Sequence, residues 1–388
     1  MPASSKRITF GSTGAGTLLV TLCLILLAIG LCVVASASIA IGERGGEATH
    51  AILRKQLMFA PVGLLAAVIA ARFDYRRYQK WVKPLVGLTV LLLVLTLIFG
   101  PKINGSHRWI KLGSIQLQSS ELAKITLCVA LAAWLDKYRR RTEDVRYGLL
   151  YPLAIIGLIA LPVFAAPDFG TTFLLVGVGF ILLFLTGARL GPMLLTAALG
   201  LNAFLFAIMH SPVRLKRIIS FLDPQKYENN ESYQLSNALY AFMQGGASGV
   251  GFGHGMLQRH YLPEPHTDFI FAIIGEELGI TATLLLLVLY VSIFLCGLEI
   301  SRKAHGTFAR LLALGLTLVI TLQAFINMGV VTAILPTKGL PLPFISYGGS
   351  SLVVSCAMVG ILINIARMTA SRELIDQASP VKDRSRHF

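Results

Sequence analysis

The chain has 388 residues, of which 55% are hydrophobic and 14% charged, and it carries a formal net charge of +15. A mean hydropathy of +0.71 excludes a soluble globule of this length and predicts an all-α polytopic membrane protein. The positive charge does not indicate nucleic-acid binding, because no basic run is interleaved with stacking aromatic residues.

About ten transmembrane helices are predicted, since a helix needs about 17 to 25 apolar residues to cross roughly 30 Å of hydrocarbon. The first is about twice as long as a signal-peptide core, so we interpret it as retained. A single membrane domain is expected over 16–367, between an N-terminal tail, 1–15, and a C-terminal tail, 368–388. The predicted spans are 16–40, 56–72, 84–100, 119–136, 148–166, 171–187, 190–210, 269–297, 308–330 and 349–367.

Lys and Arg gather in every second connection between these helices. Five lie in 72–83 and five in 137–146, and 21 of the 34 fall on this one side. Short loops rich in Lys and Arg stay in the cytoplasm, so both termini are predicted to be cytoplasmic. The five cysteines lie inside predicted helices without a close-spaced pair, which indicates neither a disulfide framework nor a zinc site.

Polar residues concentrate on the opposite, outer side. Glu121 and Lys124 open the fourth helix one turn apart and can pair; the alternative is an ordinary helix start capped by Ser119 or Ser120. Asp168, between the fifth and sixth helices, either faces a substrate or caps the sixth helix.

A large extracytoplasmic loop is predicted over 211–268, between helices 7 and 8. Arg214 and Arg217 form a basic cluster suited to a phosphate at headgroup depth, or else they snorkel from a helix end. The glycine-rich stretch 245–255 lacks the Gly-Lys-Ser/Thr of a phosphate loop, so a tight turn or a close backbone approach is expected.

The connection between helices 9 and 10, residues 335–351, contains three prolines and too little apolar length to span. Irregular backbone at membrane depth must be buried by protein or line a cavity. We therefore expect a re-entrant segment with Lys338 directed at an anion or a carboxylate. The alternative is a surface turn with Lys338 in solvent.

Asp268 lies where a polar turn meets the eighth helix. A carboxylate at the boundary between water and lipid is a functional candidate, because its pKa is raised there and it is prepared for proton transfer. The alternative is that Thr267 or Asp268 caps the helix. Glu276 and Glu277 lie about two turns deeper, and at least one is expected to meet a buried partner, such as a Lys or Arg of helix 4 or of the re-entrant segment.

Together these motifs resemble the SEDS family, the membrane glycosyltransferases of bacterial cell-wall synthesis, over nearly the whole chain. Residues 335–339 are more similar to the division members than to the elongation members. The chain departs from the family pattern at Ser119, Pro265 and 256–260. The motifs are Arg108-Trp109-Ile110, Glu121-Leu122-Ala123-Lys124, Pro167-Asp168-Phe169-Gly170-Thr171, Tyr233-Gln234, Leu262-Pro263-Glu264, His266-Thr267-Asp268-Phe269-Ile270 and 341–350.

The resemblance implies an enzyme that polymerises lipid II, the undecaprenyl-pyrophosphate-linked disaccharide-pentapeptide, at the outer face of the bacterial cytoplasmic membrane. It implies a class B penicillin-binding protein transpeptidase and other divisome membrane proteins as partners. Asp268 occupies the position of the family's essential aspartate.

Joining two such units requires a general base, for which we assign Asp268, and positive charge beside the leaving pyrophosphate. Arg214 and Arg217 would supply that charge, with Lys338 or a divalent cation, Mg²⁺ or Mn²⁺. No metal-ligand set is predicted. The remaining residues assigned to the substrate site are Arg108, Glu121, Lys124, Asp168, Tyr233, Gln234, Glu264, His266 and Ser346.

Two other functions remain open. A lipid II flippase or other transporter should place ionisable residues near the bilayer midplane and show related halves. A non-catalytic division scaffold would need no base at a lipid-facing cleft.

Overall fold

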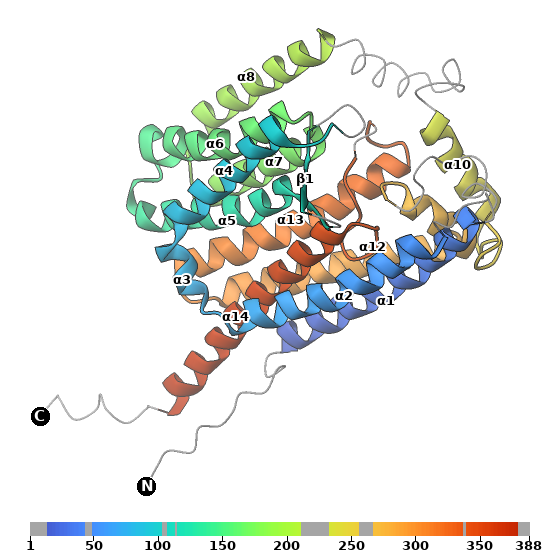
Figure 1. Ribbon diagram of the computed structural model, residues 1–388. Helices are drawn as coiled ribbons and strands as arrows, with labels where there is room; N and C mark the ends of the chain where they lie inside the picture. The colour runs from blue at the N-terminus through green and yellow to red at the C-terminus, as the bar shows by residue number, and fades with distance from the viewer. Residues whose placement is uncertain are drawn as a thin grey trace, which may run out of the picture.

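The computed structural model describes residues 14–42, 49–102, 107–112, 115–210, 233–255, 267–336 and 339–378. It is a bundle of long helices (Figure 1). The helices that coincide with the ten predicted spans are α1 (Gly14–Gly42), α2 (Thr49–Arg72), α4 (Val82–Phe99), α5 (Ser119–Lys137), α6 (Tyr151–Ala165), α7 (Phe169–Leu185), α8 (Leu190–Met209), α12 (Ile270–Lys303), α13 (Thr307–Val331) and α14 (Gly349–Ala378).

The polytopic membrane fold is confirmed. Seven of the described helices are long and apolar enough to cross a membrane by length and composition, α6 together with the short π turn η2 (Arg146–Leu150). α7 and α8 are shorter apolar helices, and α5 carries Glu121, Lys124, Asp136 and Lys137. The number of ten crossings stays a prediction.

α13 lies at the centre of the bundle and contacts α12, α5, α7 and α14. α2 packs along α14, and the two helices run in the same direction, since Gly360 lies against Ala67 and Asn364 against Ala71. An added Cβ at Gly360 would lie 2.3 Å from the Ala67 carbonyl oxygen, so only glycine allows this approach. α8 lies along the outer edge and exposes most of its leucines, which suits contact with lipid (Figure 1).

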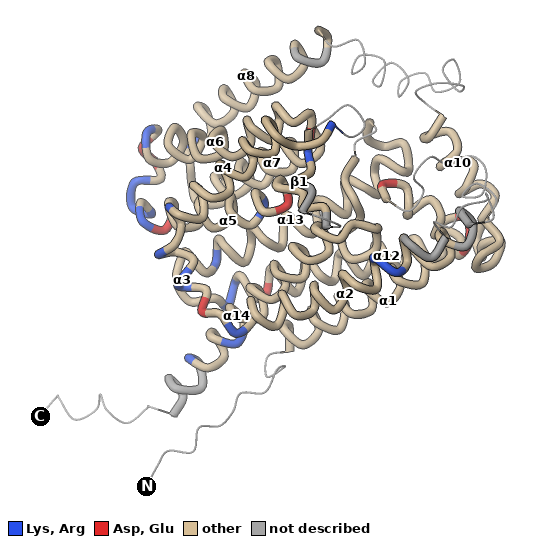
Figure 2. Tube along the Cα trace, in the orientation of Figure 1, with Lys and Arg blue, Asp and Glu red and all other residues tan. Residues whose placement is uncertain are grey.

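The basic clusters gather at one end of the bundle. Figure 2 shows Lys and Arg around α3 (Tyr75–Lys80), around the 3₁₀ turn η1 (Arg139–Arg141) and near the end of α14. Gln79 of α3 donates to Asp136 of α5 at 2.9 Å, which joins two of these clusters. α1 begins and α14 ends at this same end (Figure 1), as expected for an even number of crossings.

Besides the short helix α3 and the turns η1 and η2, a hairpin and a further helix were not predicted. Residues 109–118 form an antiparallel hairpin of β1 (Trp109–Leu112) and β2 (Ile115–Gln118), with Ile110 paired to Leu117. Apolar and polar residues alternate over 110–112 and 115–118, which is typical of half-buried strands. The predicted large loop also contains a helix, α10 (Tyr233–Gly245), which packs on α12.

α12 is interrupted at Gly279, whose φ of 77° and ψ of −178° are not helical. The glycine-rich stretch pairs with the interrupted backbone: Val250 N donates to Glu276 O and Ile280 N to Gly246 O, both at 3.0 Å. An added Cβ at Gly249 would lie 2.1 Å from the Glu277 carbonyl oxygen. The glycine-rich stretch was expected to turn tightly or to approach another chain, and it approaches the backbone of α12 in this same chain.

Candidate functional site

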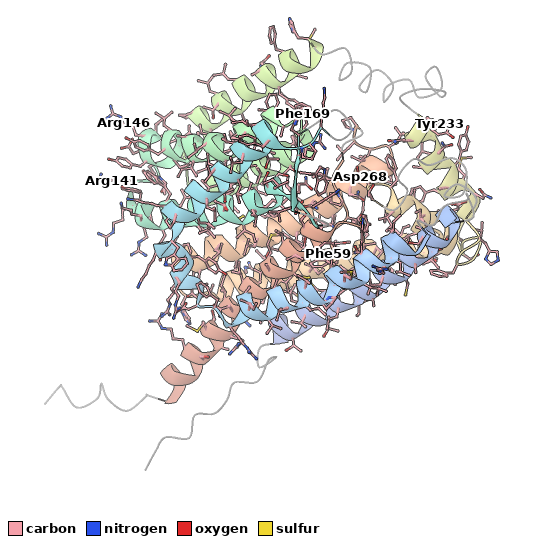
Figure 3. All side chains as sticks on the ribbon, viewed as in Figure 1. Phe59, Arg141, Arg146, Phe169, Tyr233 and Asp268 are labelled. Atoms are coloured by element: carbon pink, nitrogen blue, oxygen red, sulfur yellow. The ribbon has the colours of Figure 1, made fainter. Side chains whose placement is uncertain are left out.

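Asp268 lies in a three-residue turn, 267–269, directly before α12, and its side chain is half-buried. Figure 3 places it between the middle of the molecule and Tyr233, on the side away from Arg141 and Arg146. The N-cap position of α12 belongs to Phe269, which makes no side-chain capping bond. Neither Thr267 nor Asp268 therefore occupies the capping position that was the alternative interpretation.

The segment 339–348, between α13 and α14, is non-helical, and most of it is buried, although Gly339 is exposed. Leu340, Leu342, Phe344 and Ile345 are each at most 3% exposed, which satisfies the requirement that irregular backbone in a membrane protein be covered by protein. Its depth in the membrane stays a prediction. An added Cβ at Gly339 would lie 2.8 Å from Asp268 Oδ2, so the segment lies directly against the carboxylate.

Two side chains fasten this segment to the turn that carries Asp268. Asn327 Nδ2 donates to the Asp268 carbonyl at 2.8 Å and to the Leu340 carbonyl at 2.7 Å. Ser346 Oγ donates to the Thr267 carbonyl at 2.7 Å and accepts from Leu342 N at 2.8 Å. Ser346 thus connects backbone to backbone, and its assignment to substrate binding stays a prediction.

Beneath the segment lies a buried ion pair. Lys124 Nζ is 2.7 Å from Glu121 Oε1, and the two side chains are 0% and 2% exposed. The predicted pairing is confirmed. Lys124 also donates to Gln323 Oε1, and Gln323 Nε2 donates to the Pro341 carbonyl, each at 2.7 Å. The N-cap of α5 is Gln118, so neither Ser119 nor Ser120 holds the capping position.

Asp168 and Arg108 organise the start of α7. Asp168 is the N-cap, with Oδ1 accepting from Thr171 N at 3.3 Å, and its other oxygen accepts from Ser120 Oγ at 2.9 Å. The capping interpretation is confirmed, and at 2% exposure the carboxylate is enclosed. Arg108 binds the Pro167 carbonyl, so its guanidinium holds the loop between α6 and α7.

Glu277 is 1% exposed and Glu276 is 0% exposed. Glu277 Oε1 accepts from Ser36 Oγ of α1 at 2.6 Å and from Gly253 N at 3.1 Å. A buried partner is therefore present for Glu277, but it is the Ser36 hydroxyl of α1 and not a Lys or Arg of helix 4 or of the re-entrant segment. Glu277 joins the outer part of α12 to α1 and to the glycine-rich stretch.

Five predicted site residues lie outside the described residues: Arg214, Arg217, Glu264, His266 and Lys338. Tyr233 and Gln234 are described, and they open α10 as half-buried side chains. Within the described part of the chain, no three His, Cys, Asp or Glu side chains gather closely enough to hold a metal ion.

Sequence reasoning missed Gln323 and Asn327. Both lie on α13 and are 1% exposed. Their spacing of four puts them on one face of a mainly apolar helix, and polar side chains so placed need buried partners. That spacing was the available signal.

The Asp268 side chain is partly exposed, and the segment 339–348 lies against it. This geometry supports proton acceptance by the Asp268 carboxylate. A base held in this way can act on a hydroxyl group brought to it. The enclosed Lys124 and Asp168 are bonded to protein groups, and Glu121 pairs with Lys124 through Oε1, while its buried Oε2 has no hydrogen-bond partner among the described residues. They support the backbone around the site: Lys124 through Gln323 and the Pro341 carbonyl, and Asp168 through the cap of α7.

A family model for cell cycle proteins of the FtsW, RodA and SpoVE type matches residues 17–371. The chain is 39% identical over 350 residues to a probable peptidoglycan glycosyltransferase FtsW of Coxiella burnetii, covering 89% of this chain and 94% of that protein. It is 36% identical over 362 residues to stage V sporulation protein E of Bacillus subtilis, covering 93% and 99%.

Solved structures are similar as well. One is a chain from work on the structural coordination of polymerization and crosslinking by a peptidoglycan synthase complex, with a TM-score of 0.75 and 27% identity over 90% of this chain and 96% of that chain. Another is the rod shape determining protein RodA of Thermus thermophilus, with a TM-score of 0.67 and 25% identity over 92% and 97%.

Proposed function

The chain belongs to the FtsW/RodA/SpoVE family, also known as the SEDS family, and from this premise we propose that it is a peptidoglycan glycosyltransferase that uses Asp268 as its general base. Its substrate is lipid II, and its product is a glycan strand that remains linked to undecaprenyl pyrophosphate. The identity to FtsW relatives, at 39% for Coxiella burnetii, supports the division branch of the family.

The reaction is a single displacement. The 4-hydroxyl oxygen of the acceptor sugar attacks the anomeric carbon of the donor, and its proton passes to the Asp268 carboxylate. The bond between that carbon and the pyrophosphate oxygen breaks, and undecaprenyl pyrophosphate leaves with the electron pair. Configuration at the anomeric carbon inverts, so no enzyme nucleophile is required.

One observation carries the assignment of Asp268. Its carboxylate lies against Gly339 in a turn that the protein fastens from two sides, through Asn327 and Ser346. A general base is effective only when its position is fixed relative to the proton that it accepts. The half-buried side chain remains partly open to a substrate.

The leaving pyrophosphate needs positive charge, because its charge grows as the bond breaks. Arg214 and Arg217, in the connection between α8 and α10, are the proposed cations, assisted by Lys338, which directly precedes Gly339 in the sequence. A divalent cation, Mg²⁺ or Mn²⁺, could serve in place of Lys338.

The enzyme is a multi-pass protein of the bacterial cytoplasmic membrane, with the basic end of the bundle in the cytoplasm and Asp268 at the outer face. The gathering of basic clusters on the side of the bundle away from Asp268 supports this orientation.

The partner that crosslinks the glycan is a class B penicillin-binding protein, which works together with other divisome membrane proteins. The similar chain from a peptidoglycan synthase complex supports this assignment. Two long neighbouring helices, α12 and α13, differ in how much surface they offer to such a partner. α13 is mostly buried, whereas α12 exposes an apolar stripe that includes Ile280, Leu284 and Val288. The stripe on α12 is the proposed docking face.

The test is polymerisation of purified lipid II by the detergent-purified protein, alone and with its partner, with Asp268→Asn compared to the natural sequence. Asn has the same shape but cannot accept the proton, so polymer is expected to disappear while thermal stability stays unchanged. Unchanged polymerisation by the variant would remove the assignment. A transporter or a scaffold is indicated if the natural protein makes no polymer in either condition.

A further inference from the structure

The buried face of α13 that carries Gln323 and Asn327 has no role in the reaction described so far. Both side chains reach the backbone of the segment next to Asp268, and they lie one helical turn apart. We propose that Asn327 is a positioning residue for the base: its amide fixes the distance between the Asp268 carboxylate and the wall formed by residues 339–341. This inference rests on the proposed function of Asp268.

Asn327 is suited to this role by its bonding pattern. A single amide nitrogen donates to the carbonyls of Asp268 and Leu340, at 2.8 and 2.7 Å. These carbonyls belong to chain segments 72 residues apart, so the amide is a clamp between distant parts of the backbone. Both acceptors are oxygen atoms, so the amide must present its nitrogen to them.

Gln323 extends the clamp into the core. Its amide oxygen accepts from Lys124 and its amide nitrogen donates to the Pro341 carbonyl. The buried Glu121–Lys124 pair is thereby connected through Gln323 to the same segment that Asn327 joins to Asp268. The Lys124 charge orients the Gln323 amide, because a cation binds the oxygen and leaves the nitrogen for the carbonyl.

The consequence is a carboxylate whose location depends on α13. A Cβ added at Gly339 would lie only 2.8 Å from Asp268 Oδ2. A small displacement of the 339–341 segment therefore changes the space in front of the carboxylate. A misplacement of about 1 Å in a catalytic group can reduce the rate about 100-fold. Loss of the Asn327 amide should therefore act on the chemical step more than on substrate binding.

The experiment compares Asn327→Ala and Asn327→Asp with a matched control, Thr321→Val. Thr321 is buried on the same helix, and its hydroxyl bonds only within that helix, to the Thr317 carbonyl. Initial polymerisation rates are measured against lipid II concentration between pH 5.5 and 8, with thermal stability recorded for each protein.

For Asn327→Ala we expect kcat to fall at least about tenfold, with KM within about twofold of the Thr321→Val protein. Asn327→Asp keeps the shape, but its ionised form has no donor, whereas its protonated form can donate to one of the two carbonyls. Its rate relative to the natural protein should therefore exceed that of Asn327→Ala and rise as pH falls. The ionisable groups that these contacts bring toward position 327 are Asp268 and, through Gln323, the Lys124–Glu121 pair.

Rates of both Asn327 variants within about twofold of the control would overturn the inference. So would equal rates for the Ala and Asp variants at every pH, because the donor would then not be the cause. Asp268→Asn, measured alongside, separates the two proposals. If it polymerises normally, the proposed function fails; if it is inactive while Asn327→Ala matches the control, only the positioning role fails.

Discussion

Replacing Lys124 by Met should destabilise the protein strongly, because it leaves the Glu121 carboxylate buried without its cation. At the observed 2.7 Å between Nζ and Oε1, an effective dielectric constant of about 20 gives a gross attraction of about 6 kcal/mol. The desolvation of both ions offsets most of this attraction, so the net contribution of the intact pair is small. Removing one partner alone nevertheless costs about 3–5 kcal/mol.

The double variant Glu121→Leu/Lys124→Met should recover much of this loss. Replacing a buried ion pair by apolar side chains of similar volume is often neutral, but Gln323 Oε1 loses its donor here, which costs about 1–2 kcal/mol. The assay is thermal unfolding in detergent for the two single variants, the double variant and the natural protein. Additive losses, with no coupling between the two positions, would refute the interpretation of the pair as mutually dependent.

The same four proteins distinguish a supporting role of Lys124 from direct contact with the substrate. If Lys124 acts only through Gln323 and the 339–341 segment, the double variant should regain polymerisation in part together with stability. If Lys124 contacts lipid II, stability returns without activity.

Two further substitutions test the local structure. Gly279→Ala should destabilise the protein by about 3 kcal/mol or more, because only glycine adopts this conformation readily and the new Cβ would lie 2.4 Å from the Ala247 carbonyl oxygen. Thermal unfolding should show no such loss for the control Gly191→Ala, where the added Cβ meets open space. Equal losses of stability in the two variants would contradict the described backbone. Asp168→Ala should lower the free energy of unfolding by about 2–3 kcal/mol, since both the cap of α7 and the hydrogen bond from Ser120 disappear. Asp168→Asn can still cap the helix, so its loss of stability in the same measurement should be smaller. A larger loss for Asp168→Asn than for Asp168→Ala would argue against capping.

The helices could be predicted because each is an apolar run bounded by polar residues, and a membrane allows such a run few other conformations. The hairpin over 109–118 was missed because two four-residue strands carry a weak alternation signal beside neighbouring spans of about 20 residues. α10 was missed because the sequence was divided only into spans and loops. Its apolar residues recur at helical spacing, which was the unused signal.

The candidate site was predictable only in part. The sequence places Asp268 at a helix start and Glu121 one turn before Lys124, because such relations follow from helix geometry alone. The bonds from Asn327 to Asp268 and Leu340 connect segments 59 and 13 residues away. No local pattern determines which carbonyls a buried amide will meet, since tertiary packing decides it. The interruption at Gly279 was equally inaccessible, because it depends on a distant strip of backbone that takes over the hydrogen bonds of the helix.

That interruption also sets a length. The 24 residues from Ile280 to Lys303 measure about 36 Å at 1.5 Å per residue, which spans the roughly 30 Å hydrocarbon layer at a tilt of about 30°. An unbroken helix of all 34 residues would measure about 51 Å. Because the regular helix is interrupted at Gly279, the part of α12 from Ile280 to Lys303 has a length that suits a single crossing of the bilayer. In the proposed orientation, the short outer part, with Asp268 just before it, would then lie level with the lipid headgroups, where the diphosphate of lipid II is proposed to bind.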